Sequence, residues 1–399
     1  EIVATFRVQK GPGLEARAER MALGVAQGSG TDLPGASPER AWGYGGRVMD
    51  VDDTGKDTAV RIAYPAGSLP PQLSVVLVLV AGNLSLDGET RLEHLQLPDH
   101  FLHALPGPQH GVPGLRRRLS VPDRPLLMSS FKSPNGWEFD DWEKALHHQW
   151  EGGADLVTDD PACFEDSESN LLRRVERARE IAEQVARDEG RRPVYAFNLT
   201  ASGPDLPAQA ERLAAAGAEA FQISPYAVGL DMLTALTRLQ ARPIILAHPA
   251  LSGPFTYAGR GLSPAVALGQ LVRAAGADVS IYPSYPSYPS HPSGYDSEVS
   301  LTVSSADASA IGRALTRPGP RRPVWPAPEA GIHPGLLPAL VRDVGPHVIV
   351  NAGGAIHAHP GGTRAGAAAF RQALDRLLGR GGPVPDELAQ ALARWGGAA

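Results

Sequence analysis

Cysteine is almost absent from this 399-residue chain, which contains only Cys163. One cysteine excludes a disulfide framework within the chain and a zinc site built from CxxC pairs. We interpret Cys163 as a packing residue, and we expect a protein of a reducing compartment, the cytoplasm. Neither acidic nor basic residues are in strong excess, since the net charge is only −6 and charged residues make up 20% of the chain. This balance argues against nucleic acid as a partner.

Long hydrophobic runs are missing as well. The longest, residues 73–82, is about half of the ~20 residues that a membrane-spanning helix needs. No secretory signal is visible at the start, because residue 1 opens directly into a strand-like segment. We therefore expect no contact with a membrane. What the chain has in excess is Gly (44) and Pro (37), although not at the level typical of disorder.

The first 120 residues predict a small α+β domain on an antiparallel sheet. Runs rich in β-branched residues, bounded by Gly, Pro and Asp, predict strands over residues 2–8, 43–51, 58–64 and 73–80. Helices are expected over residues 14–26 and 91–97. We place the domain boundary at residue 120.

Residues 121–399 have a different pattern, in which a strand is followed by a helix eight times. The expected strands are continuous apolar runs, as in buried parallel sheets, over residues 126–132, 155–158, 194–199, 220–223, 244–247, 278–282, 324–325 and 348–350. Eight such units in roughly 250 residues predict a (β/α)8 barrel. A doubly wound sheet is the alternative, but no GxGxxG follows the first of these strands.

Active sites of such barrels lie where the strands end, and two basic side chains stand there. Lys132 follows the first barrel strand and His248 follows the fifth. Both are candidates for moving a proton, although a surface lysine and a structural histidine are the alternatives. Asp159 and Asp160 follow the second strand and could bind Mg²⁺. Adjacent side chains of an extended segment point in opposite directions, so only one of the two should face the barrel mouth.

Glycine-containing turns follow the last two strands and open into helices, which is the usual phosphate site of these barrels. The alternative is that these glycines only form tight turns. Together with polar residues after other strands, the candidate substrate or phosphate contacts are Asn135, Asn198, Glu329, Gly331, His333, Gly353 and Gly354. The Tyr-Pro-Ser tract of residues 282–295 favours polyproline II, either as a lid over the mouth or as a stiff surface loop.

Four segments of the chain resemble the large-subunit family of ribulose-bisphosphate carboxylase (RuBisCO). They are GPQHGVPGLRRRLSVPDRPLLMSSFKSPNG at residues 107–136, GGADLVTDD at residues 152–160, GGAIHAHPGGTRAG at residues 353–366 and VAGN at residues 80–83. The resemblance implies a ferredoxin-like α+β domain followed by the barrel. It also implies a homodimer whose active site lies between one barrel and the partner's N-terminal domain, where Asn83 would contribute as a catalytic residue.

The departures from the family concern the metal site first. Thr158 stands where the family has the lysine that becomes a carbamate and binds Mg²⁺. Asp160 is kept, and Pro161 replaces the glutamate ligand. Thr has no amine to carbamylate and Pro has no carboxylate, so the conventional site should not form, and we expect no cofactor and disfavour Mg²⁺.

Other departures concern the loops around the mouth. The first lysine of the family's KPK element is kept as Lys132, and the second is Asn135. The phosphate motif SGG appears as residues 329–331, which puts the carboxylate of Glu329 where a phosphate would approach. The Tyr-Pro-Ser tract replaces a lysine-bearing lid, and Gln27 stands where the N-terminal domain has an acidic residue.

The chain therefore resembles the RuBisCO-like proteins of form IV rather than a CO2-fixing carboxylase. The expected activity is proton transfer next to a carbonyl, as an isomerase, epimerase, enolase or lyase, on a small phosphorylated sugar or keto compound. Lys132 could stabilise the enolate while His248 moves the proton, or the roles could be reversed. One alternative is the Mg²⁺-dependent diketo-methylthiopentyl-phosphate enolase of methionine salvage. The other is a catalytically inactive scaffold that binds a ligand.

Overall fold

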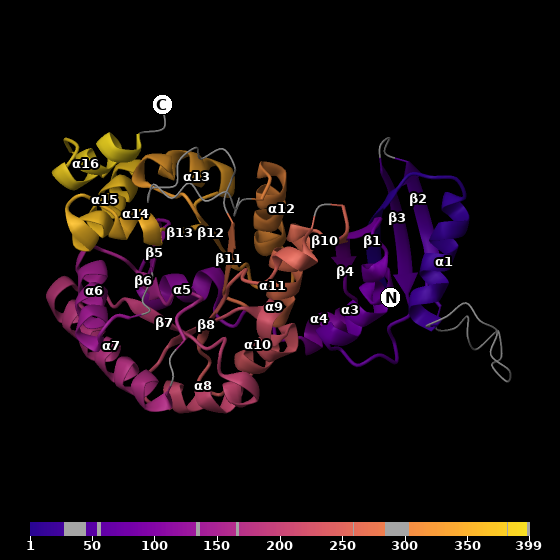
Figure 1. Ribbon diagram of the computed structural model, residues 1–399, viewed down its shortest axis with the longest axis horizontal. Helices are drawn as coiled ribbons and strands as arrows, with labels where there is room; N and C mark the ends of the chain where they lie inside the picture. The colour runs from indigo at the N-terminus through magenta and orange to yellow at the C-terminus, as the bar shows by residue number, and fades with distance from the viewer. Residues whose placement is uncertain are drawn as a thin grey trace.

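The computed structural model describes residues 1–27, 45–53, 57–132, 136–164, 167–257, 259–283, 303–380 and 382–396. Figure 1 shows two parts side by side, a small sheet with its helices and a ring of strands wrapped by helices. No helix among the described residues is long and apolar enough to cross a membrane.

The N-terminal part has the element order βαββαβ of a ferredoxin-like domain. Its elements are β1 (Ile2–Gln9), α1 (Leu14–Gln27), β2 (Arg47–Asp53), β3 (Asp57–Tyr64), α3 (Leu73–Ala81), η1 (Asn83–Leu86) and β4 (Thr90–Gln96). The strands pair antiparallel in the order β4-β1-β3-β2. Every second residue of β1 is buried, from Ile2 to Val8, because one face of the sheet packs on the helices.

Two predictions in this part are wrong. Residues 73–80 were expected as a strand and form helix α3, whose buried residues Leu73, Val76 and Val80 lie on one helical face. A short run of apolar β-branched residues does not distinguish a buried helix from a strand. Residues 91–97 were expected as a helix and form strand β4, which pairs with β1 and buries Thr90, Leu92 and Leu95. The strand expected at residues 43–51 begins only at Arg47.

The second part is the predicted (β/α)8 barrel. Its eight-stranded parallel sheet runs in the order β12-β11-β9-β8-β7-β6-β5-β13, and β12 and β13 pack side by side to close the ring. The strands are β5 (Leu126–Ser130), β6 (Leu156–Thr158), β7 (Val194–Asn198), β8 (Ala220–Ile223), β9 (Ile244–Ala247), β11 (Val279–Pro283), β12 (Trp325–Glu329) and β13 (Ile349–Asn351).

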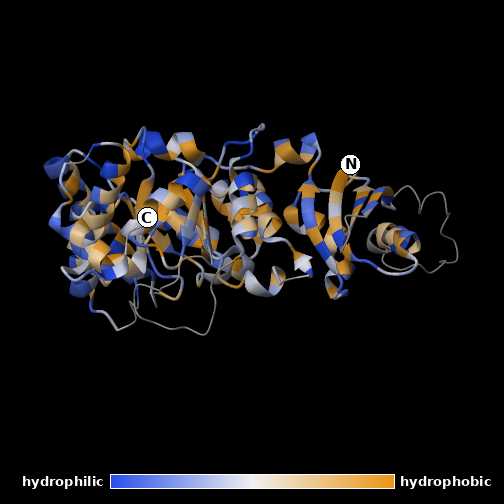
Figure 2. Cartoon of the chain, turned by 90° about the horizontal axis from the view of Figure 1, so that it is seen from above, coloured by the Kyte–Doolittle hydropathy of each residue, from blue (hydrophilic) through white to orange (hydrophobic). Residues whose placement is uncertain are grey.

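Helices surround this ring (Figure 1). They are α6 (Phe139–Glu151), α7 (Glu168–Glu189), α8 (Leu206–Ala215), α9 (Pro225–Val228), α10 (Leu230–Thr237), α11 (Val272–Ala275), α12 (Ser305–Thr316), α13 (Leu337–Val344), α14 (Gly353–His357), α15 (Gly362–Leu377) and α16 (Asp386–Trp395). Side chains of the strands fill the barrel, and Val112, Leu115 and Leu119 of α5 (Gly111–Leu119) join this core. Figure 2 shows hydrophobic residues along the strands of both parts, between helices of mixed polarity.

The two parts are joined by more than the connecting helix α4 (Asp99–Ala104). The short strand β10 (Gly261–Leu262), which follows β9 in the barrel, pairs parallel with β4 of the N-terminal sheet. The next segment is the π-helix η4 (Ala265–Leu271), which continues directly into α11. Its Gln270 exchanges two 3.0 Å hydrogen bonds with the backbone of Leu95 in β4. The barrel therefore extends the N-terminal sheet by one strand.

Candidate active site

Four titratable side chains meet at the mouth of the barrel, each from the end of a different strand. Lys132 follows β5, Asp160 follows β6, His248 follows β9 and Glu329 ends β12. The Lys132 Nζ atom lies 3.2 Å from Asp160 Oδ2. The His248 Nε2 atom lies 3.6 Å from Glu329 Oε1. Active sites of such barrels lie where the strands end. The residues chosen on this basis do lie close together in the structure.

The ring of His248 is held in one orientation. The backbone N–H of Ala250 donates to His248 Nδ1 at 3.1 Å, so the neutral ring carries its hydrogen on Nε2, on the side of Glu329. His248 is only 8% exposed. Burial lowers its pKa; the Glu329 carboxylate opposes that shift, and Lys132 adds to it. The neutral ring therefore presents a hydrogen-bond donor to the mouth.

The carboxylate of Glu329 is also oriented by neighbours. Asn351 Nδ2 donates to Glu329 Oε2 at 3.3 Å, and Ser130 Oγ donates to Asn351 Oδ1 at 3.0 Å. The chain then turns through two left-handed residues, Ala330 with φ of 69° and Gly331 with φ of 73°. A left-handed conformation is unfavourable for alanine by roughly 1–2 kcal/mol, and such strain clusters at functional sites.

Lys132 rests against the glycine turn after β13. A Cβ atom added at Gly353 would lie 2.8 Å from Lys132 Cε and 2.5 Å from the carbonyl oxygen of Ser130. Only glycine leaves room there for the lysine stem. The partner carboxylate of Asp160 is fixed in turn, since Asp160 Oδ1 accepts the backbone N–H of Ala162 at 3.0 Å.

Asp159 points away from the mouth, as expected for one of two adjacent aspartates. Its carboxylate is 2% exposed and accepts hydrogen bonds from the guanidinium of Arg174, the hydroxyl of Tyr195 and, at 2.9 Å, the backbone N–H of Asn198. Arg174 lies in α7, whose sequence gave no sign that this arginine is buried. Asp159 thus forms part of a buried network between β6, β7 and α7.

Asn198 braces the loop after β6. Its side-chain NH2 group donates to the carbonyl oxygens of Pro161 and Cys163, and its Oδ1 accepts from Thr200. All of its polar side-chain atoms are used in this way. Its predicted contact with substrate stays a prediction.

The other candidate residues are more dispersed. His333 is 6% exposed, its ring lies 6.4 Å from that of Trp395, and its Nδ1 has no hydrogen-bond partner within the described ranges. Gly354 follows Gly353 in the short helix α14. Asn83 is exposed in the N-terminal domain. Asn135 and residues 284–295 of the Tyr-Pro-Ser tract lie outside the described residues.

Both parts of the chain match the models of one family. Residues 1–104 match the N-terminal domain of the ribulose bisphosphate carboxylase large chain, and residues 111–395 match its catalytic domain. The chain therefore belongs to the RuBisCO large-chain family. It is a RuBisCO-like enzyme, of form IV.

Individual relatives narrow this class further. The chain is 38% identical to the 2,3-diketo-5-methylthiopentyl-1-phosphate enolase of Bacillus licheniformis, over 99% of this chain and 98% of the relative. It is 37% identical to the enolase of the same name from Geobacillus kaustophilus, over 99% and 98% of the two chains. Among solved structures, a rubisco-like protein from Alicyclobacillus acidocaldarius is 40% identical with a TM-score of 0.84, covering 99% of this chain and 100% of that one. Octameric Rubisco from Pyrococcus horikoshii is 27% identical with a TM-score of 0.87, covering 98% and 93%.

These relatives overturn the expectation that no cofactor takes part. Both are named as 2,3-diketo-5-methylthiopentyl-1-phosphate enolases. This is the enolase that the family resemblance described as dependent on Mg²⁺. The residues of this chain nevertheless do not fit the three ligands of the carbamate site. Thr158 is fully buried and its hydroxyl donates to Gln222 Oε1 at 2.9 Å, Pro161 has no carboxylate, and Asp160 is paired with Lys132.

The rest of the described chain gives no ready substitute for these ligands. Among the described residues, no three His, Cys, Asp or Glu side chains gather closely enough to hold a metal ion. A metal ion in this protein would need a ligand set different from that of the carbamate site.

Proposed function

We propose that this enzyme removes a proton next to a carbonyl group in a small phosphorylated keto compound, as an enolase. The cluster of Lys132, His248 and Glu329 at the barrel mouth carries the proposal. The names of the relatives make 2,3-diketo-5-methylthiopentyl 1-phosphate the first substrate to test.

Two donors in this cluster suit the negative charge that develops on the carbonyl oxygen. Lys132 is a cation paired with Asp160, and neutral His248 presents its Nε2–H. Donors fixed in advance around a developing oxyanion stabilise the transition state without reorganisation. The orientation of the His248 ring favours this role over that of a base, because the lone pair on Nδ1 is occupied by the Ala250 N–H.

Glu329 is the group best suited to accept the proton. It is a carboxylate among donors: Asn351 Nδ2 donates to its Oε2, and its Oε1 lies 3.6 Å from His248 Nε2. In the proposed step, the substrate C–H bond breaks, the proton moves to a Glu329 oxygen, and the electron pair moves to the carbonyl oxygen beside His248 and Lys132. The donors lower the energy of the enolate, and the carboxylate removes the proton in reach of them.

A single phosphate on the substrate agrees with the charges around the mouth. The backbone at Gly353 and Gly354, after β13, is the proposed phosphate contact. Gly331 and His333, after β12, are proposed as further phosphate contacts, but the adjacent Glu329 carboxylate would repel a second phosphate there. Asn198 and Asn135 are proposed as further substrate contacts.

We also propose a homodimer of the cytoplasm, in which Asn83 of a second copy reaches the barrel mouth. Asn83 is exposed and lies in the N-terminal domain, after α3. The related Pyrococcus horikoshii Rubisco is described as octameric, which shows that this fold supports assembly. Light scattering of the purified chain should give twice the monomer mass of 42.1 kDa.

The enolase activity can be tested directly with purified full-length protein. Incubation with 2,3-diketo-5-methylthiopentyl 1-phosphate should yield the enol, followed by absorbance or NMR. Lys132→Ala should lower kcat at least about 100-fold, because one oxyanion donor contributes on the order of 10²–10³ in kcat. Lys144→Ala, which alters an exposed lysine of α6, is the matched control.

Two results would contradict the proposal. One is the absence of turnover by the wild type with tight binding of the same compound, which would favour the inactive scaffold. The other is an equal rate for Lys132→Ala and Lys144→Ala, which would remove Lys132 from the mechanism.

A further inference from the structure

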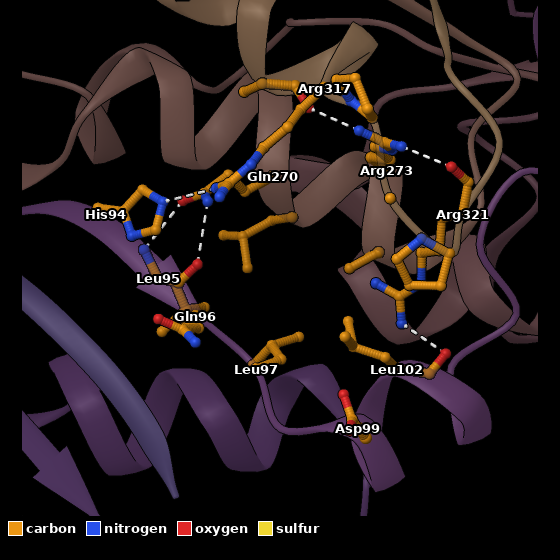
Figure 3. Close-up of a pocket in the computed structure, with 16 residues that line it drawn as sticks. His94, Leu95, Gln96, Leu97, Asp99, Leu102, Gln270, Arg273, Arg317 and Arg321 are labelled. Carbon is orange, nitrogen blue, oxygen red and sulfur yellow. Dashed lines mark hydrogen bonds between the residues drawn. The ribbon is translucent and has the colours of Figure 1, made fainter.

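A cavity lies between the two domains, away from the barrel mouth. It has a volume of about 350 Å³, within the range of pockets that hold small ligands. Figure 3 shows its walls, with His94 and Leu97 from the N-terminal side facing Gln270, Arg273 and Arg317 from the barrel side. None of the residues of the proposed active site lines it.

The cavity has an excess of positive charge. Arg273, Arg317 and Arg321 line it, and Asp99 is the one carboxylate among its lining residues. Within the described ranges, none of the three arginines forms an ion pair. Buried or partly buried cations are normally paired with carboxylates, so the lack of such a partner is unusual for Arg273 and Arg321, which are buried and half-buried.

The hydrogen bonds of the arginines show which of them has a structural role. Arg273 donates to the carbonyl oxygens of Ala314, Arg321 and Arg322, so it holds the end of α12 in place. Arg321 donates to Leu102 O at 3.2 Å at the end of α4, but its buried Nε has no partner among the described residues.

Arg317 is the most available of the three. It follows α12 and is exposed, and the one hydrogen bond of its side chain in the described part of the chain joins it to the His94 ring at 3.4 Å. Two of the three guanidinium groups therefore keep N–H donors for a ligand.

The surroundings of Arg321 favour a bound anion. Burial and the neighbouring Arg273 lower the pKa of Arg321 to about 10. A bound anion would reverse both effects, because it would offset the repulsion between the guanidinium groups and replace their lost hydration.

One wall of the cavity has a backbone conformation that is rare. Gln270 and Leu271 belong to η4, a π-helix of seven residues. Segments of π-helix are uncommon and frequently occur at functional sites. Here η4 holds Gln270 in its two bonds to Leu95, so the wall connects the domains at a fixed distance.

We propose that this arginine cavity, formed by residues of β4, α4, η4, α11, α12 and the segment after α12, binds a small phosphorylated compound as a second site, separate from the barrel mouth. The phosphate would lie between Arg317 and Arg321, since guanidinium groups match phosphate oxygens in geometry and charge. Leu97, Leu102 and Ala274 provide an apolar wall for the carbon part of the ligand.

Inorganic pyrophosphate is the probe, titrated by calorimetry into the full-length protein at constant ionic strength. Arg317→Ala should weaken binding about tenfold or more, the usual effect of losing one charge-assisted hydrogen bond. Arg317→Lys should recover part of the affinity, because it restores charge without the planar group. Arg313→Ala, an exposed arginine of α12 that does not line the cavity, should bind as the wild type does.

Binding at the barrel mouth is separated by Lys132→Ala, which should retain the component that is sensitive to Arg317. The inference is overturned if Arg317→Ala binds pyrophosphate as tightly as Arg313→Ala does. It is also overturned if Lys132→Ala abolishes all binding. Failure of the enolase assay would leave this result intact, since the titration needs no turnover.

Discussion

We predict that the same substitution, Asp to Asn, has different effects on stability at the two adjacent aspartates after β6. Asp159→Asn removes the charge that faces Arg174, whose side chain is 7% exposed. Breaking a buried pair by removing one partner costs about 3–5 kcal/mol, because the other charge stays buried. Asp160→Asn removes a partner of Lys132, whose side chain is 45% exposed, and an exposed pair contributes only about 0–1 kcal/mol.

These free energies translate into melting temperatures. The catalytic-domain match spans residues 111–395, and an unfolding entropy of about 2.1 cal/mol/K per residue gives roughly 0.6 kcal/mol/K for a unit of that size. Asp159→Asn should therefore lower the Tm by about 5–8 °C, and Asp160→Asn by less than about 2 °C. The effect on activity should not follow the effect on stability: Asp160→Asn should slow turnover of the folded enzyme, because Lys132 loses the carboxylate that positions it.

Calorimetry of the wild type and both variants at one pH and salt concentration measures the difference. The reasoning is refuted if Asp160→Asn destabilises the protein as much as Asp159→Asn does. Such a result would mean that the Lys132 pair, and not the Arg174 network, holds the loop after β6.

Two further predictions concern the pH dependence of stability and the packing beside Lys132. Burial lowers the pKa of His357 from 6.5 to about 4, so the unfolded chain takes up this proton first as the pH falls. The stability that neutral His357 contributes is complete above pH 6.5 and is lost as the pH falls from 6.5 to about 4, by up to about 3 kcal/mol. Urea titrations over this pH range should show that His357→Gln loses less unfolding free energy than the wild type does. Equal losses in the two proteins would contradict the assignment of this pH dependence to His357. Gly353→Ala should lower the Tm and kcat, because its Cβ would meet Ser130 O at 2.5 Å, whereas Gly253→Ala has open space and should change neither; equal effects would remove the steric argument.

The barrel could be predicted from the sequence because its strands are fully buried and appear as short continuous apolar runs. The N-terminal domain was harder to predict, because short apolar runs do not distinguish a strand from a buried helix. Residues 73–80 are apolar and β-branched, yet form α3, and residues 91–97 contain the charges of an exposed helix, yet form β4. In both cases the packing of the sheet decided the conformation against the local pattern.

The site was predictable to the extent that the ends of barrel strands converge. Lys132, Asp160, His248 and Glu329 could be selected in this way. The burial of Asp159 against Arg174 could not, since it depends on how α7 packs. The orientation of the His248 ring depends on one backbone N–H, which no side-chain pattern encodes.

The arginine cavity could not be predicted from the sequence for another reason. It joins residues from positions 94–102, 270–274 and 314–321, which only the contact between the two domains brings together. No local motif marks such a site.

The measurement that tests the central claim most directly is exchange of the substrate α-proton with D2O, followed by NMR, for the wild type and Glu329→Gln. The amide of glutamine keeps the shape of the side chain but cannot accept the proton as a carboxylate does. The account predicts exchange by the wild type and a loss of at least about 100-fold in the variant, the lower end of what a positioned base contributes. Exchange at the wild-type rate in Glu329→Gln, with its Tm unchanged, would contradict it.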